Sequence, residues 1–126
     1  MVRLTIRVDF EPGHALGPGK IHLLEQIDET GSIRGAAAAM KMSYRRAWLL
    51  IQATEKTFGT PLVVAAAGGR RGGGASLTDL GKRVVGLYRQ IEKQAGKATV
   101  RSAKALAHSR HSKLKKPQKS AKNKQS

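Results

Sequence analysis

A run of small residues, Gly35–Ala39, constrains the fold of this chain more than any other feature. Ser32 precedes the run and can cap a short helix over residues 33–40, because a serine at that position accepts a hydrogen bond from a free helix N–H group. Small side chains on this helix let another helix pack closely. Lys41-Met42 leaves room only for a tight connection, and Ser43 offers the next N-cap. We therefore predict two helices joined by a tight turn.

The second helix of this pair is predicted to be amphipathic and to run to about Thr57. Apolar residues recur at i, i+3, i+4 and i+7, the spacing of one helix face. These residues are Tyr44, Ala47, Trp48 and Ile51. Arg45 and Arg46 belong to the first turn, on the other side of the helix. Tyr44 fits either a core position or an exposed one.

A strand and a helix are predicted before this pair. Residues 3–10 alternate between apolar and polar, which is typical of a half-buried strand. The inward residues of this strand would be Leu4, Ile6, Val8 and Phe10. Pro12-Gly13 and Gly17-Pro18-Gly19 then break the chain. A helix follows from Pro18 or Lys20 to Thr30, and Gly31 is a suitable end for it.

A hairpin and a long helix are predicted after the pair. Residues 62–66 and 75–77 have the composition of strands, and the glycine-rich segment Gly68–Gly74 joins them. Thr78 can cap a last helix that reaches about Lys97. The element order indicates a mainly α domain with small β: a winged helix-turn-helix with an N-terminal strand and a long C-terminal helix, within residues 1–97.

The last helix is longer than a small core requires, since a helix of about 20 residues measures roughly 30 Å. Its apolar stripe continues along this length, so we expect a second copy of the chain to cover part of it. The chain is therefore predicted to form a homodimer through its C-terminal helix. The dimerisation residues would be Leu80, Val84, Leu87 and Ile91.

The charge is strongly positive and unevenly distributed. The 126 residues include 24 Lys+Arg and 8 Asp+Glu, a formal net charge of +16. Nine of the basic residues and none of the acidic ones lie in residues 101–126. Residues 98–126 have few large apolar side chains, so we predict a disordered basic tail there. Such a tail either tethers the protein to nucleic acid or serves only as a solubilising extension.

Several classes of protein are not favoured by the sequence. There are no cysteines, which excludes disulfides and thiolate chemistry. Apolar runs are far shorter than the roughly 18 residues of a membrane span. The N-terminus, Met1–Thr5, leads into alternating polar residues without the continuous apolar core of a signal peptide, so we expect a cytoplasmic, nucleoid-associated protein without a membrane partner. Neither Gly13–Lys20 nor Gly68–Gly74 has the spacing of a nucleotide-binding loop.

The ionisable residues indicate neither a metal site nor an active site. The four histidines do not form a ligand constellation: His14 and His22 flank a glycine-rich turn, and His108 and His111 belong to the tail. The acids Glu25, Asp28 and Glu29 suit a solvated helix end. We therefore expect no metal, no cofactor and no enzymatic activity.

The chemistry that the predicted fold can perform is the recognition of double-stranded DNA. The DNA major groove is about 12 Å wide and admits one helix, whose N-terminal side chains reach the base edges. Ser43, Tyr44, Arg45 and Arg46 lie at that end of the helix. An arginine can donate two hydrogen bonds to guanine, so Arg45 or Arg46 is predicted to read a base, while Ser43 caps the helix or binds a phosphate. Arg70 and Arg71 of the hairpin would contact the neighbouring minor groove or the backbone.

The same residues carry a resemblance to a known family. Leu23–Ile27, Thr30–Ile33, Met42–Trp48 and the glycine-rich Gly68–Ala75 resemble the N-terminal domain of ModE-type molybdate-responsive regulators, and LysR-type regulators share the broader pattern. The resemblance covers residues 3–97 and implies a winged-helix dimer that binds DNA. Members of that family continue into molybdate-binding modules, whereas this sequence continues into the basic tail. Molybdate binding is therefore not expected on this chain.

Three functions remain open from the sequence. The first is a sequence-specific transcriptional regulator that lacks an effector domain of its own. The second is an architectural, nucleoid-type protein whose binding is dominated by the tail and barely depends on sequence. The third is a sensor that binds an oxyanion directly on the winged-helix domain.

Overall fold

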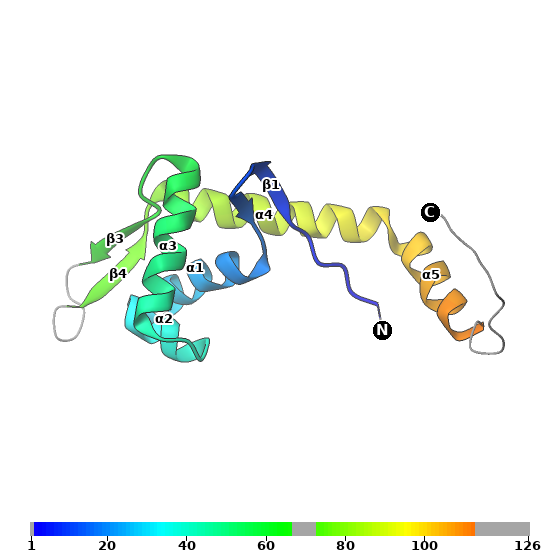
Figure 1. Cartoon of the computed structure of the whole chain (residues 1–126), viewed down its shortest axis with the longest axis horizontal. Helices are drawn as coiled ribbons and strands as arrows, with labels where there is room; N and C mark the ends of the chain where they lie inside the picture. The colour runs from blue at the N-terminus through cyan, green and yellow to red at the C-terminus, as the bar shows by residue number, and fades with distance from the viewer. Residues whose placement is uncertain (1, 67–72, 113–126) are drawn as a thin grey trace. The chain divides into compact units, whose positions relative to one another are not determined.

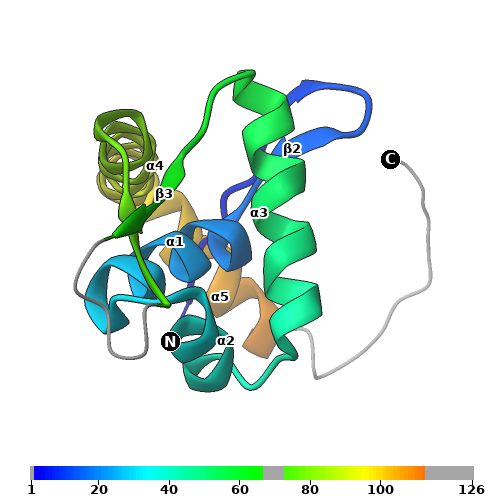
Figure 2. The same ribbon diagram turned by 90° about the vertical axis from the view of Figure 1, so that its left-hand side faces the viewer.

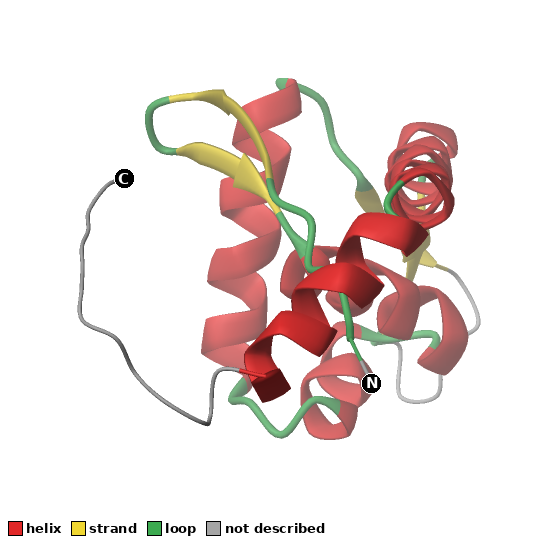
Figure 3. Cartoon of the chain, turned by 90° about the vertical axis from the view of Figure 1, so that its right-hand side faces the viewer, coloured by secondary structure: helices red, strands yellow, loops and turns green. Residues whose placement is uncertain are grey.

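The computed structural model describes residues 2–66 and 73–112, which are mainly helical with two small antiparallel hairpins (Figures 1 and 3). This confirms the predicted fold class, a winged helix-turn-helix. The elements are, in chain order, β1 (Val8–Glu11), β2 (His14–Leu16), α1 (Pro18–Thr30), α2 (Ile33–Ala39), α3 (Tyr44–Phe58), β3 (Val63–Ala66), β4 (Gly74–Leu77), α4 (Asp79–Ala98) and α5 (Val100–Ser112).

The ends of α1, α2 and α3 lie where the sequence predicts them, and the capping residues explain why. The Ser32 Oγ accepts a hydrogen bond from the Gly35 N–H at 2.8 Å. The Ser43 Oγ accepts one from the Arg46 N–H at 3.0 Å. Gly31 ends α1 with φ at 80°, a left-handed conformation that glycine adopts without a steric penalty. Local capping chemistry therefore sets the helix boundaries.

The turn between α2 and α3 closes through two backbone hydrogen bonds of a Schellman motif. The Lys41 N–H donates to Ala38 O at 3.1 Å, and the Met42 N–H donates to Ala37 O at 3.0 Å. Lys41 occupies the position that usually holds glycine, and its φ is 56°. A side chain in this left-handed conformation costs roughly 1–2 kcal/mol. The strained residue therefore lies at the apex of the helix-turn-helix pair.

Helix α1 is central, and it buries two faces in two clusters (Figure 2). One cluster joins α1 to α4 and the strands; its buried members are Leu16, Ile21, Leu24, Leu62, Leu77, Val84 and Tyr88. The other joins α1 to α2 and α3; its buried members are Leu23, Ile27, Ala36, Ala37, Ala47, Ile51 and Ala75. The alanines of the second cluster confirm that small residues let the helices approach closely.

An ion pair of Arg89 connects helix α4 to α1. Arg89 donates from Nε and Nη2 to the two carboxylate oxygens of Glu25, at 2.9 and 2.7 Å, and from Nη1 to Glu92 at 2.6 Å. The hydrogen bond from Arg89 lowers the pKa of Glu25 below its ordinary value. The two bonds to Glu25 join residues that are 64 positions apart in the chain and link α4 to α1, whereas the bond to Glu92 lies within α4.

The N-terminal strand differs from the prediction. Instead of one strand over residues 3–10, β1 pairs with β2 in an antiparallel hairpin whose turn contains Gly13, with φ at 84°. Leu4 and Phe10 are exposed, and Phe10 makes an edge-to-face contact with Phe58. Alternation marks a pleated segment but does not show how far a partner strand extends. The Pro12-Gly13 break therefore proves to be a hairpin turn.

The predicted disordered tail is also wrong for its first part. The described residues form two compact units, residues 5–92, and residues 2–4 together with 93–112. Helix α5 occupies residues 100–112, and the Ala103 N–H donates to Thr99 O at 2.8 Å. Its alanines, arginines, lysine and leucine have high intrinsic helix propensity, which low hydrophobicity does not cancel. The rest of the tail, residues 113–126, lies outside the described residues.

Candidate nucleic-acid interface

The first turn of α3 carries two arginines without an acidic partner. Arg45 and Arg46 are exposed, and neither forms an ion pair within the part of the chain that the structure describes. The Ser43 hydroxyl, predicted either to cap the helix or to bind a phosphate, accepts the Arg46 N–H as a cap. That bond fixes the first turn from which both arginines project.

Tyr44 and Trp48 do not belong to the buried face of α3, although the sequence pattern predicts Trp48 in its apolar stripe. Each side chain is 43% exposed. The buried residues of α3 are Ala47, Ile51 and Thr54. The buried face of α3 thus follows Ala47, Ile51 and Thr54, and Tyr44 and Trp48 lie outside it. Both aromatic residues remain available to a partner.

Arg34 of α2 is a cationic residue that the sequence pattern did not single out. Its guanidinium carbon lies 4.9 Å from the centroid of the Tyr44 ring, a cation–π contact. Of the two predicted positions for Tyr44, core or exposed, the structure shows the exposed one, and the Tyr44 ring stacks with the Arg34 guanidinium group. A sequence signal for Arg34 exists, since no acidic residue occurs between Glu29 and Glu55.

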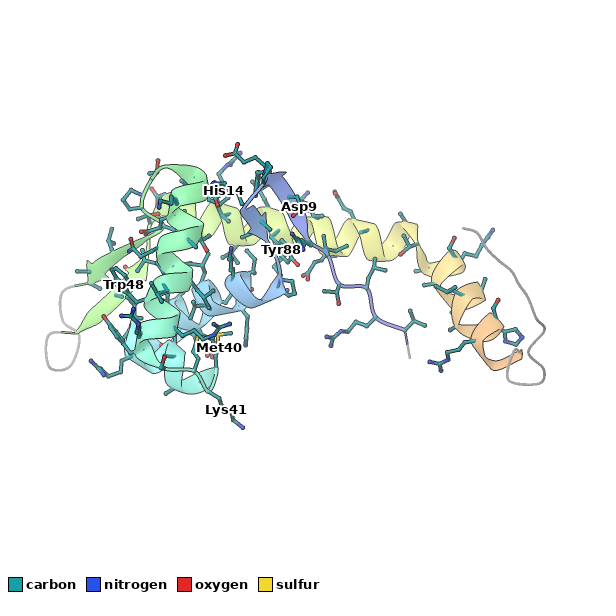
Figure 4. The ribbon with its side chains drawn as sticks, in the orientation of Figure 1. Asp9, His14, Met40, Lys41, Trp48 and Tyr88 are labelled. Atoms are coloured by element: carbon teal, nitrogen blue, oxygen red, sulfur yellow. The ribbon has the colours of Figure 1, made fainter. Side chains whose placement is uncertain are left out.

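The helix-turn-helix segment is therefore uniformly positive. Arg34, Lys41, Arg45 and Arg46 are all exposed, and Lys41 extends from the apex of the turn (Figure 4). Acidic residues instead neutralise arginines elsewhere in the same unit: Asp9 pairs with Arg7 at 2.8 Å, and Glu25 and Glu92 pair with Arg89. Among the described residues, the four exposed cations of α2, α3 and their connecting turn thus form no ion pair.

The β3–β4 hairpin is bonded to α3 and to α1. The Glu55 carboxylate of α3 accepts the N–H groups of Leu62 and Val63 at 2.8 and 3.1 Å. The Ala75 N–H donates to Gly31 O at 2.8 Å, at the end of α1. These bonds hold the base of the hairpin at a set position beside α3. Arg70 and Arg71, predicted to contact DNA, lie outside the described residues.

The four predicted dimerisation residues of α4 separate into two pairs. Val84 is buried in the first core cluster, and Leu80 packs against it. Leu87 and Ile91 are 46% and 42% exposed. The first turns of α4 thus serve the domain's own core, which needs their apolar face to cover α1 and the strands. Leu87 and Ile91 alone among the four offer a free surface.

The described residues contain neither a metal-ligand cluster nor a membrane-spanning helix. Within residues 2–66 and 73–112, no group of three or more His, Cys, Asp or Glu side chains is arranged to hold a metal ion. In the same ranges, no helix is both long and apolar enough to cross a lipid bilayer.

Comparison with known proteins places this arrangement in a family. Residues 19–82 match the model of bacterial regulatory helix-turn-helix proteins of the lysR family. The molybdenum transport protein ModE of Azotobacter vinelandii is 46% identical over 85 residues, which are 68% of this chain and 32% of that protein. The DNA-binding transcriptional dual regulator ModE of Escherichia coli K12 is 40% identical over 81 residues, 62% of this chain and 31% of that protein. The chain therefore spans about a third of these relatives.

Solved structures share the fold. The CbnR DNA-binding domain in a complex with DNA aligns with a TM-score of 0.55 at 24% identity, over 70% of this chain and 95% of that one. Full-length LysG of Corynebacterium glutamicum aligns with a TM-score of 0.53 at 23% identity, over 72% of this chain and 30% of that one. The family match covers α1 to the start of α4, the segment that contains the helix-turn-helix pair and the hairpin. The chain belongs to the lysR family of bacterial regulatory helix-turn-helix proteins.

Proposed function

We propose that this chain is a transcriptional regulator that binds specific sequences of double-stranded DNA in the cytoplasm. Helix α3 would enter the major groove, with Arg45 or Arg46 donating to a guanine edge. The observation that carries the proposal is the pair of exposed, unpaired arginines in the first turn of a helix whose preceding turn is closed and capped. The name of the Escherichia coli relative, a DNA-binding transcriptional regulator, supports it.

The proposal is tested by measuring sequence preference, not affinity alone. A preferred duplex is first selected from a random pool, and titrations compare it with a scrambled duplex of equal length. Arg45→Ala or Arg46→Ala is expected to reduce discrimination at one base pair by about 1–3 kcal/mol, because the missing bond is one made to a base edge. Lys56→Ala, an exposed cation in the last turn of α3, is the matched control and should preserve discrimination. Unchanged discrimination in both arginine variants would contradict the assignment.

The proposal includes a homodimer that reads a two-fold site. Leu87 and Ile91 are large apolar side chains on the solvent side of α4, and a second copy would remove them from water. The double variant Leu87→Asp/Ile91→Asp is expected to sediment as a monomer at concentrations at which the wild-type chain is a dimer. Lys82→Asp also places an acid on an exposed position of α4 and should leave the dimer intact. A monomeric wild-type chain would refute this part of the proposal.

The C-terminal segment would add affinity without sequence preference. Residues 101–126 contain nine basic residues and no acidic residue, and lysines bind phosphates independently of base sequence. A chain that ends at Ser112 is expected to show a shallower dependence of log K on log salt, by about 0.9 for each phosphate that the removed residues neutralise. Its preference for the selected duplex should persist. Loss of that preference on truncation would show that the tail, and not α3, reads the sequence.

A further inference from the structure

A groove of about 400 Å³ lies between α3 and the β3–β4 hairpin. Its apolar wall is formed by Trp48 and Tyr44 of α3 and by Val64 and Ala65 of β3. Figure 4 shows Trp48 on the side of α3 that faces the hairpin. Trp48, Tyr44 and Val64 are each more than two-fifths exposed, and none of them belongs to either core cluster. The groove therefore has an apolar wall that the fold leaves uncovered.

The polar groups around this groove favour an anionic partner. Arg34 lines it, and its guanidinium group is held over the Tyr44 ring without a carboxylate partner in the described ranges. One carboxylate, that of Glu55, also lines the groove, but it already accepts two hydrogen bonds from the backbone N–H groups at the start of β3. An apolar wall beside an available cation suits a partner that alternates neutral rings with anionic groups.

The proposed DNA-binding function indicates which partner would occupy this groove. If α3 occupies a major groove and the hairpin reaches the adjacent minor groove, one sugar–phosphate strand separates the two elements. That strand must cross the space between α3 and the hairpin, which is where the groove lies. We propose that the groove seats one DNA sugar–phosphate strand, with a deoxyribose against Trp48 and Val64 and a phosphate on Arg34. This inference rests on the proposed DNA-binding function.

Trp48 is the single tryptophan of the chain, so its fluorescence reports directly on this seat. Binding of the selected duplex, followed independently by the anisotropy of a labelled DNA, is expected to lower acrylamide quenching of Trp48 roughly twofold, since a side chain that is 43% exposed becomes covered. If the duplex binds but acrylamide quenching of Trp48 is unchanged, the DNA strand does not occupy this groove, and the proposed function is unaffected. Absence of any duplex binding would overturn both.

Substitutions of Trp48 distinguish a contact with the DNA sugar–phosphate backbone from a contact with the bases. Trp48→Ala is expected to weaken binding to the selected and scrambled duplexes by the same factor, roughly tenfold, because the indole packs on a deoxyribose at every sequence. Trp48→Phe should retain most of the affinity. A Trp48→Ala variant that lost discrimination between the duplexes would show that Trp48 reads bases and would contradict the proposal.

The proposed contact between Arg34 and a phosphate is tested by the salt dependence of DNA binding. Arg34→Gln is expected to reduce the slope of log K against log salt by about 0.9, the value for one phosphate contact. Lys56→Gln is the control for removal of one positive charge on α3, because Lys56 does not line the groove. Equal changes in slope for the two variants would refute a specific phosphate contact at Arg34. Thermal unfolding checks each variant, and exposed positions outside both clusters should leave Tm nearly unchanged.

Discussion

Truncation of Tyr88 to alanine is expected to lower the free energy of unfolding by about 3–5 kcal/mol, the usual cost of deleting a buried aromatic ring. Tyr88 is 1% exposed and belongs to the first core cluster. Its ring joins α4 to α1 and to the strands, so a cavity there would loosen three elements at once. Urea denaturation monitored by circular dichroism measures the effect.

Tyr88→Phe separates the ring from the hydroxyl group. The hydroxyl donates a hydrogen bond of 2.6 Å to Ile6 O and so holds the segment before β1. Burial raises the pKa of the Tyr88 hydroxyl above its ordinary value, so the group is a donor at neutral pH as any tyrosine is. The phenylalanine variant should lose only about 1 kcal/mol, the net value of one such bond. A phenylalanine variant as unstable as the alanine variant would show that the hydroxyl, and not ring packing, carries the stability.

Gly81→Ala is expected to destabilise the domain by about 3 kcal/mol, the upper part of the range for overpacking. A Cβ atom at this position would lie 2.4 Å from Leu62 O and 3.2 Å from the Leu77 Cβ. Leu62 is fully buried, and its carbonyl already accepts the Thr78 N–H at 2.9 Å, so the backbone cannot yield easily. Relief of the clash requires α4 to move away from the start of β3. The midpoint of urea unfolding measures the destabilisation.

The same helix offers a matched control. A Cβ atom on Gly86 would meet no heavy atom within 4 Å, and Gly86 is exposed. Gly86→Ala should therefore stabilise the domain by about 0.5–1 kcal/mol, because alanine in a helix loses less conformational entropy than glycine. The two glycine-to-alanine substitutions should thus have opposite signs. Equal destabilisation by both would contradict the close approach of α4 to Leu62.

The helix boundaries were predictable because their causes are local. Ser32 and Ser43 cap α2 and α3 through bonds that span only three residues, and Gly31 ends α1. The arginines of the DNA-binding hypothesis follow from Ser43 by simple position in the first turn. Helix α5 was not predictable from hydrophobicity, which is low in this segment and indicates disorder, although alanine, lysine and arginine are strong helix formers.

The candidate site was only partly predictable because exposure is decided by neighbours distant in the sequence. The pattern of α3 admits two buried faces that differ by a rotation, and only packing against α1 and α2 selects the one that exposes Tyr44 and Trp48. Arg34 becomes a candidate through its position over the Tyr44 ring, ten residues further along the chain. Likewise, Val84 and Leu87 belong to the same apolar pattern of α4, but Val84 is buried and Leu87 is exposed.

Residue order alone was sufficient for the helix-turn-helix pair, its caps, the hairpin and the excess of positive charge, since each depends on residues within a few positions of one another. Tertiary packing decided which faces remain uncovered: the groove beside Trp48, the exposed pair Leu87 and Ile91, and the place of the hairpin against α3. The physical reason is that local hydrogen bonds fix backbone conformation, whereas burial depends on the shapes of surfaces that only the folded chain brings together.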